Sequence, residues 1–347
     1  MKTLNTLSPA GTFYQQLPKV DLHRHLEGSL RLRTLLEVGR AHGLSLPNTN
    51  RLRELVQIGD EEPFTFENFL SKFQTLRLFY RSPEIIARLT REAVEDAAAD
   101  NVRYLELRFT PVALGRAEGF PLDQVVGWVI KGTQEAETEF GVKTRLIASV
   151  NRHEDPELAA QVARIAADHI QDGIVGLDLA GDEAGFSGLL FAGVFKEARQ
   201  AGLHITVHAG EWGGPNNVRE AIVHLGAERI GHGVRVLEDP NTTALAKERQ
   251  TTFEVCLTSN YQSGVIPALS AHPFSRMLSL GLNATLNTDD PSISNIKLSD
   301  EYRLACEDLG VSQQVLKERI LSAAEAAFLP ESERQQLKAA LAQEFSQ

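Results

Sequence analysis

The chain has 347 residues, of which 42% are hydrophobic and 23% charged, and this is enough for a large buried core. The formal net charge is −11 and no basic run offsets it, so a nucleic acid is not expected as a partner. No apolar run approaches the ~18 residues of a membrane-spanning helix, residues 1–18 lack a secretory apolar segment, and two cysteines in so long a chain are typical of a reducing compartment. We therefore expect a cytoplasmic protein that has no contact with a membrane.

Short apolar runs alternate with amphipathic stretches along the whole chain. The runs are rich in Val, Ile, Leu, Thr and Phe and predict buried parallel strands at Lys19–His25, Val102–Phe109, Thr144–Val150, Ile174–Ala180, His204–Ala209, Arg229–Gly233, Thr252–Ser259 and Asn283–Thr288. The amphipathic stretches, most of them opened by proline, predict helices at Arg31–His42, Pro83–Asp100, Pro121–Phe140, Pro156–Ile170, Gly188–Ala201, Pro215–Leu225 and Pro240–Glu248. Eight such units predict an α/β protein with a closed (β/α)₈ TIM barrel. An open doubly wound sheet is the alternative, but no Gly-x-Gly-x-x-Gly follows the first strand.

Two segments exceed a minimal barrel, and we expect the chain to be a single barrel domain over 1–347 that carries both. A helical insertion at about 51–80 contains five of the 16 phenylalanines, and Phe69 and Phe73 among them are spaced i, i+4. These aromatic residues either pack the insertion onto the barrel or form an apolar lid over a pocket. The segment at about 298–347 predicts two or three terminal helices that pack without taking part in chemistry.

A pair of histidines ends the first predicted strand. Residues i and i+2 of a strand point to the same face, so His23 and His25 would project side by side. Two imidazoles at that spacing can bind one metal ion. Glu27 follows on the same side. The pair alone is weak evidence, because most histidine pairs belong to surfaces or cores.

Other potential ligands stand at the ends of other predicted strands, which is where barrels of this kind place their catalytic groups. The fifth strand ends at His208, and Asp289 follows the eighth. Zinc at a catalytic site takes imidazole nitrogens and a carboxylate and leaves a position for water. His23, His25, His208 and Asp289 therefore form the predicted ligand set. The fourth strand ends without the lysine that bridges two ions in some barrel hydrolases, so we expect one Zn²⁺ per chain.

Three further strand-end residues are available for acid–base chemistry. His232, flanked by glycines, is predicted to take a proton from the metal-activated water. Glu211 is predicted to donate a proton if burial raises its pKa. Asp290 adjoins Asp289 on what is expected to be an extended chain, so its side chain would turn to the substrate. The alternative for each residue is an ion-paired carboxylate or a packed histidine.

These motifs resemble those of adenosine deaminases, a branch of the amidohydrolase barrels. Five segments carry the resemblance in the expected order: Leu17–Gly28, Leu177–Glu183, Val207–Glu211, Arg229–Gly233 and Leu286–Pro291. The resemblance implies that His23, His25, His208 and Asp289 bind zinc. It implies that Glu211 protonates purine N1, His232 activates the water and Asp290 contacts N7 and the attacking oxygen. It also implies that the Gly181 N–H meets N3 and that Phe69 and Phe73 form a gate.

The reaction implied is hydrolytic deamination of adenosine or 2′-deoxyadenosine to inosine or 2′-deoxyinosine and ammonia, in purine salvage. The partner is then a small purine nucleoside. Many relatives carry Asp where this chain has Glu27, placed at the ribose 5′-hydroxyl, and those that deaminate adenine or aminodeoxyfutalosine carry Glu. These 6-aminopurines rank second as substrates. A metal-dependent ester hydrolase and a non-catalytic binding barrel are further alternatives. The Cys-x-x-Cys of nucleic-acid-editing deaminases is absent.

Overall fold

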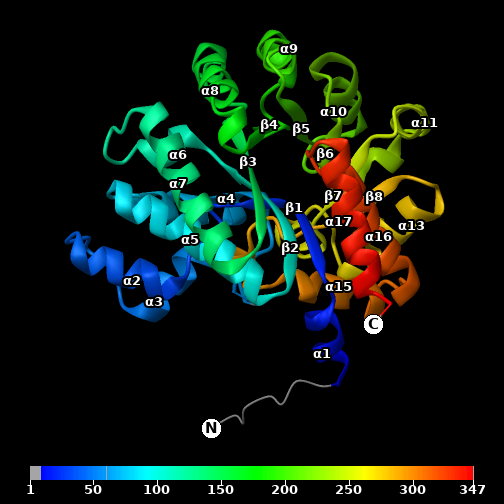
Figure 1. The fold of residues 1–347 in the computed structure, drawn as a ribbon, viewed down its shortest axis with the longest axis horizontal. Helices are drawn as coiled ribbons and strands as arrows, with labels where there is room; N and C mark the ends of the chain where they lie inside the picture. The colour runs from blue at the N-terminus through cyan, green and yellow to red at the C-terminus, as the bar shows by residue number, and fades with distance from the viewer. Residues whose placement is uncertain (1–8, 60, 347) are drawn as a thin grey trace.

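Eight parallel strands form a single sheet that curves into a nearly closed barrel, with helices around its outside (Figure 1). The computed structural model describes residues 9–59 and 61–346. The strands pair in sequence order: β1 (Lys19–His25), β2 (Val102–Phe109), β3 (Lys143–Asn151), β4 (Ile174–Ala180), β5 (His204–Ala209), β6 (Arg229–His232), β7 (Thr252–Val255) and β8 (Asn283–Leu286). The predicted (β/α)₈ barrel is confirmed.

The helices connect the strands and cover their outer faces. The α-helices are α1 (Pro9–Gln16), α2 (Leu32–Ala41), α3 (Thr49–Val56), α4 (Phe66–Leu76), α5 (Pro83–Ala99), α6 (Pro111–Gly115), α7 (Leu122–Phe140), α8 (Pro156–Asp168), α9 (Ala192–Gln200), α10 (Pro215–Glu220), α11 (Pro240–Glu248), α12 (Leu257–Gln262), α13 (Phe274–Ser279), α14 (Pro291–Ser294), α15 (Leu298–Glu307), α16 (Gln313–Ala326) and α17 (Glu331–Glu344). The 3₁₀ turns are η1 (Arg77–Phe79), η2 (Ile170–Asp172), η3 (Gly188–Phe191), η5 (Val234–Glu238) and η6 (Leu269–Ala271), and η4 (Ala221–Leu225) is a π-helical turn. No helix among the described residues has the length and apolar character needed to cross a membrane.

The barrel closes between its last and first strands through the segment that follows β8. The Asp289 N–H donates to the His23 carbonyl at 2.8 Å, and the His25 N–H donates to the Asp289 carbonyl at 2.8 Å. Helix α16 packs against both β8 and β1 and covers this junction. Closure therefore places Asp289 between the two histidines of β1.

Strands β7 and β8 are shorter than predicted. The prediction of a strand over Thr252–Ser259 is wrong after Val255, because the buried Glu301 carboxylate accepts the N–H groups of Leu257 (2.6 Å) and Thr258 (3.2 Å) and so caps the start of α12. Strand β8 ends at Leu286 instead of Thr288, because the Asn287 side chain and the Thr288 N–H bond to β1. The helices predicted at Gly188–Ala201 and Pro215–Leu225 each begin or end with a different helical turn, η3 and η4 respectively.

The insertion between α2 and α5 consists of α3, α4 and η1. Thr65 caps α4 by accepting the Asn68 N–H at 3.3 Å. The helix packs against α3 and continues into η1. The phenylalanines of the insertion lie in two environments: Phe79 is buried in the core, whereas Phe73 is half-buried at the barrel mouth. The C-terminal segment forms the three helices α15, α16 and α17.

Candidate active site

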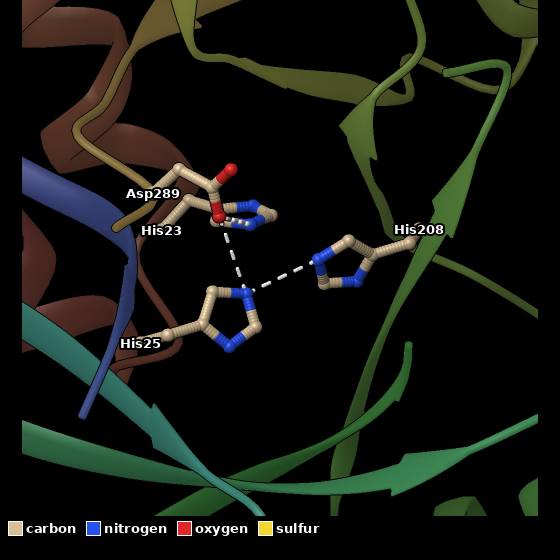
Figure 2. Close-up of side chains that lie close together, drawn as sticks. All are labelled: His23, His25, His208 and Asp289. Carbon is tan, nitrogen blue, oxygen red and sulfur yellow. Dashed lines mark hydrogen bonds and ion pairs between the residues drawn. The ribbon is translucent and has the colours of Figure 1, made fainter. Parts of the chain in front are cut away.

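Four side chains meet at the carboxyl ends of β1, β5 and β8 (Figure 2). Asp289 Oδ1 lies 3.2 Å from His23 Nε2 and 3.3 Å from His25 Nε2. His25 Nε2 faces His208 Nε2 at 3.2 Å. The four donor atoms all lie within 4.8 Å of one another. The structure thus brings together the whole predicted ligand set.

The outer nitrogens of two of these histidines contact buried carboxylates. His23 Nδ1 lies 2.8 Å from Glu254 Oε2, and His208 Nδ1 lies 3.0 Å from Asp178 Oδ1. An imidazole that donates its Nδ1–H to a carboxylate presents the lone pair of Nε2, the arrangement of metal-ligating histidines. His23 Nε2 is buried without a hydrogen-bond partner. The three shortest separations between these atoms, 3.2 to 3.3 Å, suit donors that would each lie about 2.0 to 2.2 Å from one ion. The residues therefore fit a zinc-like ion.

Arg108 connects the two carboxylates across the barrel. This fully buried side chain on β2 lies 2.8 Å from Glu254 on β7 and 3.6 Å from Asp178 on β4. Its guanidinium also donates to the Leu22 carbonyl at 2.9 Å. One cation thereby offsets the charge of both groups that hold histidines.

A second group of possible ligand atoms comprises His232, Cys256 and Asp289. It shares Asp289 with the first group and adjoins it. Burial raises the pKa of the Cys256 thiol well above its ordinary value, and the nearby Asp289 carboxylate raises it further. A protonated thiol is a poor ligand, so the four-residue group is the better metal site.

One residue at the end of β6 and one just beyond β8 have strained backbones. His232 has a φ of 61° and Asp289 a φ of 64°, in the left-handed region that non-glycine residues rarely adopt. The expectation of an extended chain is therefore wrong at Asp289, where pairing with β1 on both sides of the residue imposes the turn. The neighbouring Asp290 side chain still points elsewhere: a Cβ at Gly28 would lie 1.7 Å from its Oδ1. Only glycine leaves room for Asp290 at this point.

A cavity with an empty volume of about 580 Å³ opens above the cluster, a size typical of small-molecule sites. Its walls include ten of the eleven residues predicted to form the site: His25, Glu27, Phe69, Phe73, Gly181, His208, Glu211, His232, Asp289 and Asp290. His23 is fully buried and does not line the cavity.

The cavity contains carboxyl groups whose pKa values are raised and an imidazole whose pKa is lowered. Burial raises the pKa of Glu211 well above its ordinary value, and the Asp289 and Glu183 carboxylates raise it further. Burial also raises the pKa of Asp290, with Asp289 adding to the effect. Burial lowers the pKa of His232 well below its ordinary value. The site therefore favours neutral carboxyl groups beside a neutral imidazole.

Glu183 orients Glu211. Its two carboxylate oxygens accept the N–H groups of Gly210 at 2.8 Å and Glu211 at 2.6 Å. Glu211 Oε2 then lies 3.5 Å from His232 Nε2. The strand-to-helix turn after β5 is held so that an acid faces the cavity.

Glu27 is another buried carboxyl group that lines the cavity. Its Oε1 accepts the Thr110 N–H at 2.9 Å, whereas its Oε2 is buried with no partner. Burial raises the pKa of this carboxyl. Arg77, one turn beyond Phe73, lines the cavity as well. An unpartnered buried carboxyl oxygen indicates a place for a ligand donor.

The insertion supplies an aromatic wall. Phe69 and Phe73 both line the cavity, with ring centroids 6.5 Å apart, and Phe66 packs on Trp212 at 4.2 Å. Phe69 is also only 3% exposed and belongs to the core. Phe69 thus packs in the core and also lines the cavity, whereas Phe64 packs on Tyr261 and does not line the cavity.

Sequence reasoning missed several residues of the site. Each of them either belongs to the hydrogen bonds behind the predicted residues or lines the cavity with them: Arg108, Glu254, Ser259, Asn260, Arg77 and Trp212. A signal for two of them exists, because Arg108 and Glu254 are charged residues inside apolar strand runs, and such residues need buried partners. Ser259 and Asn260 were assigned to the end of a strand or beyond it, and α12 instead carries them to Asp289 and His232.

The barrel and its histidine- and aspartate-lined centre define an amidohydrolase-type enzyme. The family model for adenosine deaminase matches residues 18–344, and the chain belongs to this family. It is 41% identical over 320 residues to an adenosine deaminase of Klebsiella pneumoniae, covering 92% of this chain and 96% of that one. Among solved structures it resembles an amidohydrolase from Burkholderia ambifaria with bound zinc (28% identity, TM-score 0.88, 99% and 95% covered). It also resembles an adenine deaminase from Arthrobacter aurescens (26% identity, TM-score 0.86, 95% and 100% covered).

Proposed function

We propose that this protein deaminates adenosine and 2′-deoxyadenosine hydrolytically, giving inosine or 2′-deoxyinosine and ammonia. The observation that carries the proposal is the convergence of Glu211, His232 and Asp290 on one cavity beside the four-ligand cluster. Curated relatives about 40% identical over nearly the whole chain bear the name adenosine deaminase, which supports this substrate.

We propose that one Zn²⁺ is held by His23, His25, His208 and Asp289. The fit of the donor distances and the carboxylates behind His23 and His208 support this assignment. When bound, the ion lowers the pKa of an adjacent water, which is the chemistry that hydrolytic deamination requires. Ser259 holds the second oxygen of Asp289 by donating to it at 2.6 Å, so the other oxygen is free to face the histidines.

Glu211 is the proposed proton donor to purine N1. Its raised pKa favours the protonated carboxyl, which can give a proton to the ring as water adds to C6. Asp290, whose Oδ1 is buried without a partner, would accept from or donate to N7 and the attacking oxygen. The Gly181 N–H at the end of β4 would meet N3, and His232 would contact the attacking oxygen; both residues line the cavity.

A second candidate is deamination of another 6-aminopurine, such as adenine or aminodeoxyfutalosine. The observation that favours it is Glu27, whose length reduces the space at the sugar end of the cavity. A metal-dependent ester hydrolase is less well supported, because it has no need of a proton donor directed at a ring nitrogen.

The test is a substrate panel at equal enzyme concentration, followed by purine absorbance. The zinc-loaded protein should turn over adenosine and 2′-deoxyadenosine faster than adenine or aminodeoxyfutalosine. Faster turnover of adenine would replace the proposal with the second candidate. Turnover of esters without any 6-aminopurine would overturn both.

A further inference from the structure

A chain of three hydrogen bonds leads from a backbone amide to His232. The Phe274 N–H, at the start of α13, lies 3.1 Å from His272 Nδ1. His272 Nε2 lies 3.3 Å from Asn260 Oδ1, and Asn260 Nδ2 lies 3.1 Å from His232 Nδ1. All three side chains are buried, so water does not compete for these atoms.

The direction of all three hydrogen bonds follows from the first of them, which the Phe274 N–H donates. A backbone N–H can only donate, so His272 Nδ1 accepts and its ring proton must be on Nε2. That Nε2–H needs an acceptor, which makes the facing Asn260 atom the amide oxygen. The other Asn260 atom is then the NH₂ group, which donates to His232 Nδ1.

We infer that neutral His232 carries its proton on Nε2, and that His272 and Asn260 are positioning residues that impose this tautomer. Burial lowers the pKa of His272 to about 3, so the first ring in the chain stays neutral at ordinary pH and the sequence of donors and acceptors is maintained. Glu211 Oε2 at 3.5 Å and Asp289 Oδ2 at 3.9 Å both face His232 Nε2, and oxygen atoms on that side are compatible with an N–H at Nε2.

The inference rests on the proposed function for its consequence. His232 would face the attacking oxygen as a hydrogen-bond donor that stabilises developing negative charge, and not as the proton acceptor that the sequence predicts. The attacking water would then lose its proton to solvent, because a bound ion lowers the pKa of that water. For Nε2 to accept a proton, the Asn260 amide would have to turn over and His272 would have to shift its proton to Nδ1. The Phe274 N–H would then lose its acceptor.

Nitrogen-15 NMR of the zinc-loaded protein, labelled at histidine, measures the tautomer directly. His232→Ala and His272→Ala identify the two resonance pairs by their loss. We expect a pyridine-like shift at Nδ1 and a pyrrole-like shift at Nε2 for both rings. A pyrrole-like Nδ1 at His232 would overturn the inference.

Asn260→Asp reverses only the last of the three hydrogen bonds, because a carboxylate accepts from His272 as the amide oxygen did but cannot donate to His232. His232 should then show a pyrrole-like Nδ1, and kcat for adenosine should fall by about 10²-fold with little change in KM, as when one transition-state donor is lost. Asn283→Asp is the matched control, because Asn283 begins β8 at the end of the barrel away from the site and donates to Thr252. This change should alter neither the tautomer of His232 nor kcat. If Asn260→Asp reverses the tautomer and kcat rises or stays constant, His232 acts as the proton acceptor.

The two proposals fail in different ways. The tautomer is measured without substrate, so a protein that prefers adenine would still test the hydrogen-bond chain. A protein that deaminates adenosine but shows the other tautomer would refute the inference alone.

Discussion

Three of the four proposed metal ligands are each held by a second buried residue. His23 has Glu254, His208 has Asp178, and Asp289 has Ser259. A ligand held in this way loses little rotamer freedom when it binds an ion, which favours binding. Removal of one ligand should therefore affect metal binding before it affects folding.

His208→Ala should lose most of the metal, because the proposed site would retain three ligands. Elemental analysis of the purified protein should show about one zinc per wild-type chain and far less in the variant. His204→Ala is the matched control, since His204 lies on the same strand at its other end, beside Glu228. Two ions per wild-type chain, or full metal content in His208→Ala, would contradict the proposed site.

Glu27→Gln should weaken turnover of adenosine by about tenfold to a hundredfold. The buried Oε2 has no partner, and a hydrogen bond from a ribose 5′-hydroxyl to a charged acceptor is worth roughly 1.5 to 3 kcal/mol. 5′-Deoxyadenosine lacks the hydroxyl and should be affected little. Equal losses in kcat/KM on the two substrates would mean that Glu27 shapes the cavity without contacting the sugar.

At the scale of the element, α4 has two functions on two faces. Its inner face gives Phe69 and Phe73 to the cavity, while Lys72 is bonded to the Glu54 carbonyl at 2.6 Å and ties α4 to α3. The helix therefore forms part of the barrel mouth and is anchored independently of the substrate.

Replacement of both Phe69 and Phe73 with Ala should raise KM for adenosine by about tenfold, since each aromatic contact is worth roughly 0.5 to 1.5 kcal/mol. Expressed as free energies, the change in KM should exceed the loss of stability measured by thermal unfolding. Phe79→Ala is the control, because Phe79 is buried in the core and does not line the cavity; it should lower Tm and leave KM unchanged. A collapse of Tm in the double variant with constant KM would show that the pair serves packing alone.

At the scale of the whole molecule, the barrel interior beneath the site is charged. Arg229 donates to Glu254 at 2.6 Å and to Glu106, and Arg108 joins Glu254 to Asp178. These side chains come from β2, β4, β6 and β7 and are all fully buried. Buried charges need such partners, so the network couples the geometry of the site to the closed barrel.

Arg108→Gln should lower metal affinity by about 10- to 100-fold, the usual effect of losing a partner behind a ligand. Chelator competition measures this affinity without any assay of turnover. Arg103→Gln is the control on the same strand, where the arginine is half-exposed and pairs with Glu344. Unchanged affinity in Arg108→Gln would show that the two carboxylates keep their positions without the cation.

His272 should make the stability of the protein depend on pH. Its pKa is lowered from 6.5 to about 3 in the folded protein, so below pH 6.5 the folded state binds fewer protons than the unfolded state. The free energy of unfolding is therefore unaffected by His272 above pH 6.5 and decreases as the pH falls from there toward 3. The decrease is roughly 2 kcal/mol at pH 5. Denaturant unfolding of His272→Gln should show a smaller loss between pH 7 and 5. The same loss in both proteins would exclude His272 as its source.

The barrel and the residues at its mouth could be predicted from sequence patterns alone. Buried parallel strands form continuous apolar runs, so their positions are local properties of the chain. Parallel strands also end at one edge, which is why residues as far apart as His25 and Asp289 could be expected in one place.

The residues that contact them from the barrel interior could not be predicted, because they come together only in the folded protein. Arg108 and Glu254 are 146 positions apart, and no periodicity links them. The strand predicted through Ser259 would have alternated its side chains across the sheet, whereas Glu301 begins a helix there and turns Asn260 toward His232. The tautomer of His232 depends on which donors face it, and these come from loops and helices that meet only when the barrel has closed.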